Sequence, residues 1–581
     1  MPRPTPAAAT AFSLSSEIVD TIAALRPVSA TYQGVPGYDW AWDDYSPSGA
    51  AVLRSALKGC EARLKPLPAS NDRWDRLARL VAAEFLRQEI DAIDEGDPLI
   101  DLNNIASTFQ SIRQVFDVMD TGSAAGWDNV IERLRTIHRP LAGYRASLEE
   151  GKRRGRVVAR RQVRAVMSEG RTHAGDRSFF RTLPDGLRKA GFADGGRGAA
   201  LSAAVEHACA QFAAFADWLE RGYLPAATPK DGVGRARYLR NTRRFLGMDI
   251  DPIETYHWGW GEVRRIEAAM RAVSQEIKPG ATLEQVMHLL KTDPARCASS
   301  PEDFRRKMLE RQQRALADLD GRHFDIPKPI KKIDVKLAPP GGALAAYYVQ
   351  PTEDFSRTGT VWYPTGDKTV FPLYEEVSTA YHEGFPGHHL QCGFQVALSK
   401  QLSRLHRLMV WYPGYGEGWA LYAEQLMHEL GYFEKPEYVL GMYNAQLFRA
   451  CRVVIDIGSH LGLTVPKDEP WHKGEPWSYE LGVEMMEHRA HMDHEMAVSE
   501  VTRYLGWPGQ AISYKVGQRE ILRLREDFKK KAGSAFRLKE FHKRVVGSGP
   551  VGLALLRRLV LTDVPGPKRG AAKMPKRRRA A

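Results

Sequence analysis

About two thirds of the way along the 581-residue chain, three imidazoles and one carboxylate lie within eight residues. These residues are His382, Glu383, His388 and His389. Neutral imidazole is a common protein ligand of Zn²⁺, and metallohydrolases often hold a glutamate that activates water beside the first ligand. The stretch therefore predicts a hydrolytic zinc site in which His382 binds the metal and Glu383 is the general base.

The spacing of the histidines departs from the regular pattern, which places two ligands four residues apart on one helix face. Pro386 occupies the position four residues after His382. Proline clashes with the carbonyl four residues earlier, so a helix must bulge or break there, and Gly387 permits unusual dihedral angles. Such a break can return the chain towards His382. We predict His388 as the second ligand and keep His389 as the alternative.

A third protein ligand is needed, and Glu417 in the segment 414–424 is the best candidate. The segment predicts a helix, because apolar residues recur at helical spacing and Gly431 stands where a C-cap glycine belongs. Glu424 lies two turns after Glu417 and faces the same way. We predict Glu424 to support the site or contact substrate; the alternative is an ordinary surface carboxylate.

Arg452, Asp456 and His460 recur every four residues and share one helix face. A carboxylate that orients an imidazole, with an arginine nearby, is typical of the surroundings of a metal site or of a carboxylate-binding clamp. An ion pair within the helix is the alternative.

Three further residues are candidates for the same site. His491, on a helix predicted from 480 to 505, is predicted to support it. Tyr514 is predicted to donate a hydrogen bond to the oxyanion of acyl transfer, with a packed core tyrosine as the alternative. Arg523, among the arginines at 519–525, and Arg452 are the candidates for binding a substrate carboxylate.

Two of these segments also carry a family resemblance. Residues 382–391 (His-Glu-Gly-Phe-Pro-Gly-His-His-Leu-Gln) and 417–424 (Glu-Gly-Trp-Ala-Leu-Tyr-Ala-Glu) resemble the bacterial DUF885 proteins, which are grouped with the gluzincin metallopeptidases. Segments 449–456, 500–504 and 508–517 also match. The resemblance implies a gluzincin-like metallopeptidase fold, with a large helical body around a deep cleft. Similarity of residues 416–420 to a metal-binding segment of zinc aminopeptidases favours Glu417 as a ligand.

The rest of the chain predicts a mainly α protein with a small β-sheet. Helical periodicity dominates residues 16–273 and 282–320, and β-favouring runs follow at 333–337, 343–349 and 359–363. By the resemblance, the strand at 359–363 is the candidate edge that pairs with substrate, with a plain edge strand as the alternative. The predicted regions are a mobile N-terminus (1–15), a mostly helical region (16–330), a catalytic region (331–562) and a disordered basic tail (563–581).

Composition sets broad limits on location and partners. Five scattered cysteines without a paired motif, no signal-like segment and no membrane-length apolar run predict a cytoplasmic protein that does not enter a membrane. The net charge of +13 suggests an anionic partner or merely a basic tail. The basic run at 151–164 lacks the accompaniments of a nucleic-acid site, so we interpret it as a solvated helix face.

We expect a zinc-dependent hydrolase of peptide or related amide bonds, with one Zn²⁺ ion; a carboxypeptidase or a dipeptidase would fit. Two alternatives stay open. One is a metal-dependent enzyme acting on a small specialised metabolite, and the other is a metal-free binding protein with a relic site. The sequence leaves the oligomeric state open.

Overall fold

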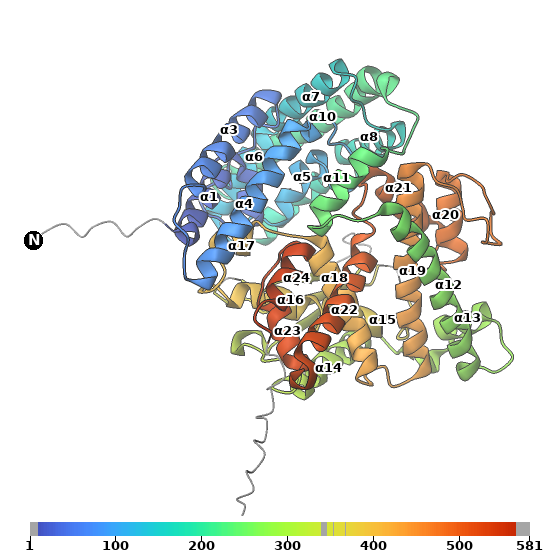
Figure 1. The fold of residues 1–581 in the computed structure, drawn as a ribbon. Helices are drawn as coiled ribbons and strands as arrows, with labels where there is room; N and C mark the ends of the chain where they lie inside the picture. The colour runs from blue at the N-terminus through green and yellow to red at the C-terminus, as the bar shows by residue number, and fades with distance from the viewer. Residues whose placement is uncertain (1–9, 339–344, 353, 367, 565–581) are drawn as a thin grey trace, which may run out of the picture.

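Amphipathic helices make up the N-terminal half of the chain (Figure 1). The computed structural model describes residues 10–338, 345–352, 354–366 and 368–564. The α-helices of this half are α1 (Ala11–Leu25), α2 (Pro27–Tyr32), α3 (Pro47–Leu64), α4 (Arg73–Asp94), α5 (Thr108–Gln114), α6 (Ala124–Thr136), α7 (His138–Arg153), α8 (Arg160–Ala174), α9 (Leu183–Lys189), α10 (Arg197–Trp218), α11 (Arg235–Leu246) and α12 (Pro252–Ile277).

The first helix begins earlier than the sequence predicts. Thr10 caps α1 by accepting a hydrogen bond from Ser13 N at 3.1 Å, and Leu14 and Ser15 are buried. The prediction that residues 1–15 are mobile is therefore wrong for 11–15, because their apolar face packs into the core. Residues 1–9 lie outside the described part of the chain.

Two hydrophobic cores are built from different parts of the sequence. One core contains Val28 and residues between 100 and 227, and so includes the buried faces of α6, α8 and α10. The other joins α1, α3 and α4 to the helices and strands that follow residue 238. The predicted division at residue 330 does not coincide with the boundary between these cores, because the N-terminal helices pack against the C-terminal region.

The sheets are small, as predicted. Strands β2 (Asp334–Ala338), β4 (Thr360–Pro364) and β3 (Tyr347–Val349) form one sheet in that order, and β1 (Cys297–Ala298) pairs with β5 (Phe371–Pro372). β4 pairs in parallel with β2 and antiparallel with β3, with Val361 opposite both Val335 and Tyr348. The predicted edge strand at 359–363 is therefore the central strand. Its backbone groups are engaged on both sides, so it has no free edge for a substrate.

The C-terminal half is again helical and holds the residues predicted to do chemistry. Its helices are α13 (Leu283–Thr292), α14 (Pro301–Leu319), α15 (Glu376–Glu383), α16 (His388–Ala397), α17 (Arg404–Leu408), α18 (Pro413–Glu429), α19 (Pro436–Leu461), α20 (Tyr479–His488), α21 (His494–Gly506), α22 (Ser513–Ala532), α23 (Leu538–Val546) and α24 (Leu553–Leu561). The mainly α fold with small β-sheets is thus confirmed.

Two glycines let α18 and α22 approach each other closely. A Cβ atom added to Gly418 would lie 2.6 Å from Gly517 Cα, and one added to Gly517 would lie 2.2 Å from the Gly414 carbonyl oxygen. Real Cβ atoms do not make such contacts, so glycine is required on both helices. The close crossing brings Glu417 of α18 and Tyr514 of α22 to the same pocket.

The helix predicted from 480 to 505 is two helices. It stops after His488 and restarts at His494, where Asp493 accepts a hydrogen bond from Met496 N at 3.0 Å as N-cap. Arg489 in the connection binds Glu267 of α12 at 2.6 Å. His491 has a positive φ of 54°. The prediction missed this break, although Asp493 is a typical N-cap residue.

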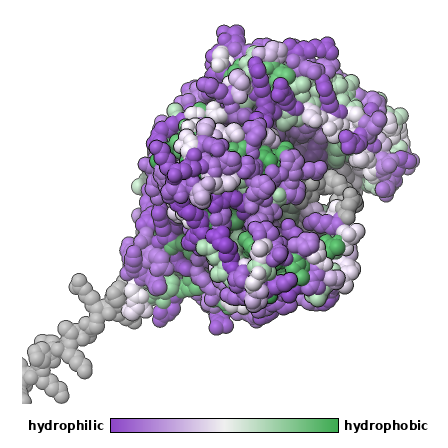
Figure 2. All heavy atoms as spheres, turned by 90° about the vertical axis from the view of Figure 1, so that its right-hand side faces the viewer, coloured by the Kyte–Doolittle hydropathy of each residue, from purple (hydrophilic) through white to green (hydrophobic). Residues whose placement is uncertain are grey.

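Figure 2 shows that the face on which α12, α13, α20 and α21 lie is mainly hydrophilic, with hydrophobic residues in small separate groups. The basic run at 151–164 spans the end of α7 and the start of α8, and its Arg153 and Arg154 both bind Glu150 at 2.6 Å while their side chains stay mostly exposed.

All five cysteines are free, as their scatter predicts. None of the helices in the described ranges combines the length and the hydropathy that crossing a bilayer requires.

Candidate functional site

The helix predicted to break at Pro386 does break there. α15 ends at Glu383, the Phe385–Pro386 peptide bond is cis, and α16 begins at His388. Trp419 of α18 donates a hydrogen bond from Nε1 to the Pro386 carbonyl oxygen at 2.9 Å. The turn between the two histidines is thereby tied to the helix that carries Glu417.

Gln312 of α14 holds the other side of this turn. Its Oε1 accepts from Phe385 N at 2.6 Å, and its Nε2 donates to the Ala380 carbonyl oxygen at 2.6 Å. The side chain is fully buried. It gives Phe385 N the acceptor that the broken helix no longer supplies, and it is a second donor to the Ala380 carbonyl oxygen, which also accepts from Gly384 N at 2.9 Å. The sequence analysis did not identify Gln312, because nothing in the local pattern links it to a turn about seventy residues away.

The turn leaves no room for a side chain at position 387. A Cβ atom on Gly387 would lie 2.0 Å from the His382 carbonyl oxygen and 2.4 Å from that of Tyr381. We expect Gly387→Ala to lower the free energy of unfolding by about 1–3 kcal/mol or more, measured by urea denaturation.

Gly261→Ala is the matched control for this substitution. Gly261 lies within α12, and nothing lies within 4 Å of a Cβ atom there. The free energy of unfolding of this control should rise by about 0.5–1 kcal/mol, because alanine restricts the unfolded chain and favours the helix. Equal stability of Gly387→Ala and the wild type would show that the turn is not as tight as described.

Two imidazoles and two carboxylates meet at the break. Glu417 Oε2 lies 3.3 Å from His382 Nε2 and 3.5 Å from His388 Nε2. Glu383 Oε1 lies 4.0 Å from His382 Nε2. The ligand atoms of His382, Glu383 and His388 also lie within 4.8 Å of one another, so this donor set could hold a metal ion. The structure thus brings together four residues predicted from the sequence.

His389 lies outside this cluster. Its Nε2 is 2.9 Å from the Ile330 carbonyl oxygen and its Nδ1 is 3.0 Å from the Tyr348 hydroxyl. Burial lowers the pKa of His389 to about 4, so the ring is neutral. With both ring nitrogens engaged, His389 joins α16 to β3 and to the segment before β2, and it does not suit the role of alternative ligand.

Glu424 fixes the orientation of His382 from behind. Its Oε1 lies 2.7 Å from His382 Nδ1, and its Oε2 accepts from Ser378 Oγ at 2.6 Å. The residue is 1% exposed, so the alternative of a surface carboxylate is wrong. Burial by itself would raise the pKa of Glu424, but Arg449 and the His382 hydrogen bond keep it below the usual value. An ionised Glu424 holds the proton of His382 on Nδ1 and leaves Nε2 facing the cluster.

Opposing effects set the charges inside the cluster. Burial would lower the pKa of His382, but Glu417 and Glu424 raise it to about 9. Burial would raise the pKa of Glu417, and the two imidazoles hold it well below its usual value. Burial raises the pKa of Glu383. In the absence of an ion the cluster therefore prefers a cation in its centre, supplied by a proton on His382.

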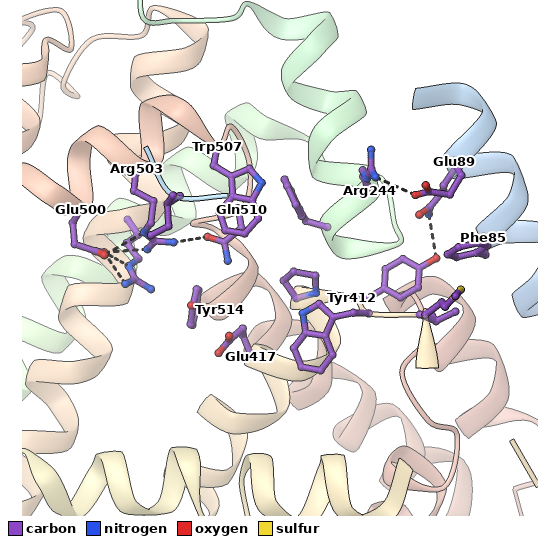
Figure 3. A pocket seen from close by; sticks show the side chains of 18 residues that line it. Phe85, Glu89, Arg244, Tyr412, Glu417, Glu500, Arg503, Trp507, Gln510 and Tyr514 are labelled. Carbon is purple, nitrogen blue, oxygen red and sulfur yellow. Dashed lines mark hydrogen bonds and ion pairs between the residues drawn. The ribbon is translucent and has the colours of Figure 1, made fainter. Parts of the chain in front are cut away.

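A pocket of about 620 Å³ opens beside the cluster (Figure 3). Glu417 and Tyr514 both line it. The Tyr514 side chain makes no hydrogen bond to any residue in the described ranges, so its hydroxyl is available to a ligand. Burial and the charge of Glu417 raise the pKa of Tyr514, so the hydroxyl keeps its proton and can donate it in a hydrogen bond.

Two arginines of α19 lie beside the ring of Tyr514. The Arg452 guanidinium carbon lies 4.6 Å from the centre of the Tyr514 ring, and that of Arg449 lies 5.8 Å away. Arg452 is also bound to Glu500 at 2.7 Å. The sequence analysis named Arg452 but assigned no role to Arg449 or to Arg503, which binds the same Glu500 at 3.1 Å. Their place beside Tyr514 and Glu500 becomes apparent only in the folded structure.

Four predicted site residues line neither this pocket nor the cluster. Asp456 accepts from the Tyr238 hydroxyl at 2.6 Å, and His460 Nε2 lies 3.1 Å from the Tyr504 carbonyl oxygen. These two buried residues join α19 to α11 and α21. His491 has the charges of Glu284 and Lys291 beside it, and burial lowers its pKa.

The fourth of these residues is Arg523, which is half exposed and binds Glu520 at 2.9 Å. Its helix turns it to the surface, so the structure does not bring Arg523 to this pocket.

A second pocket, of about 810 Å³, adjoins the first. Four residues line both, namely Glu89, Arg244, Phe245 and Trp507. Figure 3 shows Glu500 and Arg503 on one side of the first pocket and Glu89, Arg244 and Phe85 on the other, with Glu417 and Tyr514 between them. The second pocket therefore continues from the end that lies away from Arg503.

Residues 27–560 match the family described as "Bacterial protein of unknown function (DUF885)". The chain belongs to this family. Two solved structures share its fold, and both proteins carry the description "putative lipoprotein". The one from Colwellia psychrerythraea is 23% identical, with a TM-score of 0.82 over 95% of this chain and 98% of its own. The one from Shewanella oneidensis, of unknown function, is 17% identical, with a TM-score of 0.71 over 95% and 100%. A comparison with curated proteins found no match to this chain.

Proposed function

We propose that the protein is a zinc-dependent hydrolase of peptide or related amide bonds, and that His382, His388 and Glu417 hold the metal. The observation that carries the proposal is the spacing of the three donor atoms. Ligand atoms about 2.1 Å from a tetrahedral Zn²⁺ lie about 3.4 Å from one another. Glu417 Oε2 is 3.3 and 3.5 Å from the two Nε2 atoms, which is long for a hydrogen bond and suited to a shared ion.

Glu383 competes with Glu417 for the role of carboxylate ligand, since it also belongs to a triad with the two histidines. We assign the role of ligand to Glu417, because Glu417 Oε2 lies 3.3 Å from His382 Nε2, whereas Glu383 Oε1 lies 4.0 Å from it. Glu383 is then free to act as a base. Its side chain keeps some exposure, at 15%, so water can reach it.

Each remaining group has a distinct role in the proposed reaction. A zinc ion bound here would supply a Lewis acid that polarises a carbonyl and lowers the pKa of a water molecule. Glu383 accepts the proton of the attacking water and delivers it to the leaving amine. Tyr514 donates a hydrogen bond to the oxygen that gains negative charge. Glu424 keeps the His382 ring in place, as partners of metal-binding histidines usually do.

We also propose that the fold is gluzincin-like and that substrate binds in a deep cleft. The two adjoining pockets support the cleft. It also includes a cytoplasmic location, supported by five free cysteines. The related structures described as lipoproteins favour an envelope location instead, and cell fractionation of the native host separates the two.

A peptide screen tests the activity. The purified protein is stripped with a chelator, dialysed, reloaded with one equivalent of Zn²⁺ and incubated with a library of short peptides, with cleavage followed by mass spectrometry. We expect cleavage that disappears on stripping and returns on reloading. Absence of cleavage by fully loaded protein across the library would contradict the peptidase proposal and direct the same assay to small amide metabolites.

A further inference from the structure

Two buried arginines in the pocket share one carboxylate. Arg452 is 6% exposed and Arg503 is 7% exposed. Glu500 Oε2 accepts from Arg452 Nη2 at 2.7 Å and from Arg503 Nη2 at 3.1 Å, and Glu500 Oε1 accepts from Arg503 Nε at 3.2 Å. The three side chains carry a net charge of +1. Asp456 feels the charge of Arg503 and Glu417 lines the same pocket, but neither makes a hydrogen bond to Arg452 in the described chain, so an additional anion at Arg452 would be favoured.

Within this cluster, Arg452 is the residue with a donor nitrogen left for a ligand. Its Nε and Nη2 bind Glu500, and its Nε also binds the Tyr504 hydroxyl at 3.0 Å. Its Nη1 has no hydrogen-bond partner within the ranges that the structure describes. Arg503 has no comparable donor, because its Nη1 already donates to Gln510 at 2.7 Å.

Two aromatic rings hold the Arg452 guanidinium in position. Its central carbon lies 3.9 Å from the Phe448 ring centre and 4.6 Å from that of Tyr514. Rings stack on the group but supply no counterion. Arg449 adds another positive charge beside Tyr514, and its Nε is buried without a partner in the described chain. Because Nε and Nη2 already bind Glu500, a guanidinium fixed in this way offers Nη1 as a charged donor to a second carboxylate.

Arg452 and Glu417 belong to the same pocket of about 620 Å³. A sphere of that volume is about 11 Å across, and an extended residue spans roughly 3.3–3.6 Å, so the pocket holds about three residues. A carboxylate at Arg452 and a carbonyl at the cluster are then neighbouring parts of one short peptide.

Aromatic side chains supply another part of the pocket lining. Trp411, Tyr412, Phe245 and Trp507 all line it. Trp411 is 46% exposed, although large hydrophobic side chains are usually covered. These rings would bury a large apolar side chain of a bound peptide.

We propose that Arg452 Nη1 binds the C-terminal carboxylate of a peptide that bears large apolar side chains, so that cleavage takes place at the carboxyl end of the chain. The inference rests on the proposed hydrolase function. The rest of the peptide runs across Glu417 and Tyr514 towards Glu89 and Arg244, where the second pocket begins.

A binding experiment tests the carboxylate site without requiring catalysis. N-acetyl-L-phenylalanine and its C-terminal amide are titrated calorimetrically into the full-length metal-free protein, so that no zinc attracts the carboxylate. We expect the acid to bind about ten- to hundred-fold more tightly than the amide, the range for a charged hydrogen bond. Arg452→Lys should reduce this preference severalfold, and the surface variant Arg523→Lys should retain it. Equal binding of acid and amide by the wild type overturns the inference, whatever the variants do.

A kinetic comparison separates this inference from the proposed function. Peptides that the screen identifies are offered with free and with amidated C-termini. Selective cleavage of the free form supports both proposals, whereas equal cleavage of both forms keeps the hydrolase and overturns the Arg452 site. If no peptide is cleaved but the acid still binds selectively, the anion site stands and the hydrolase proposal fails.

Discussion

Alanine at His382, His388 or Glu417 will abolish stoichiometric zinc binding. Each side chain supplies one of three donor atoms, and Glu417 lies 3.3 and 3.5 Å from the two imidazole nitrogens. Removal of one donor leaves two, which is fewer than structural or catalytic zinc sites use. Loss of a partner that merely orients a ligand costs about 10–100-fold in affinity, so loss of a ligand should cost more. Elemental analysis and competition with a chromophoric chelator measure the change.

His389→Gln is the matched control for these variants. His389 is next to His388 in sequence, but it binds Ile330 and Tyr348 rather than the cluster. Glutamine can replace both hydrogen-bonding functions, so the fold should persist, as judged by circular dichroism, and zinc content should stay near one ion per chain. Loss of zinc in His389→Gln with retention in His388→Ala would reverse the assignment.

The sequence predicted the cluster because local rules determine most of its geometry. Proline at position 386 cannot continue a helix, so the break between α15 and α16 follows from one residue. The apolar periodicity of residues 414–430 predicts the helix that carries Glu417 and Glu424. The ordering of His388 over His389 follows from the same break.

Residues whose roles depend on distant partners were not predictable. Gln312 contacts the turn from α14, and Arg503 joins Arg452 only because α21 lies beside α19. Nothing local marks either residue. Strand β4 was mistaken for an edge for a related reason, since strand order depends on pairings between segments that are not adjacent in sequence.

The same limit explains the candidates that proved structural. Asp456 and His460 share a helix face with Arg452, yet only Arg452 lines the pocket, whereas Asp456 and His460 lie further along α19 and pack against α11 and α21. Arg523 has helical spacing that turns it to the surface. Periodicity shows which residues share a face, but it does not show what that face contacts.

Glu383→Gln will stop turnover while leaving the zinc in place. Glutamine keeps the shape of the side chain at the end of α15 but cannot accept a proton, so kcat on a peptide from the screen should fall about 10²–10⁴-fold with little change in KM. Glu383 Oε1 lies 4.0 Å from His382 Nε2, which is close enough for the carboxylate to reach a water molecule bound beside the cluster.

Zinc analysis of Glu383→Gln distinguishes a base from a ligand, because Glu383 also belongs to a triad of donors with His382 and His388. Full zinc with lost turnover supports the base. If zinc is lost as well, Glu383 is a ligand and another group must activate the water, whereas wild-type turnover would remove Glu383 from the reaction altogether. Glu424→Gln gives the contrast: it alters the partner of His382 Nδ1, so its main effect should be on zinc affinity rather than on kcat at saturating zinc.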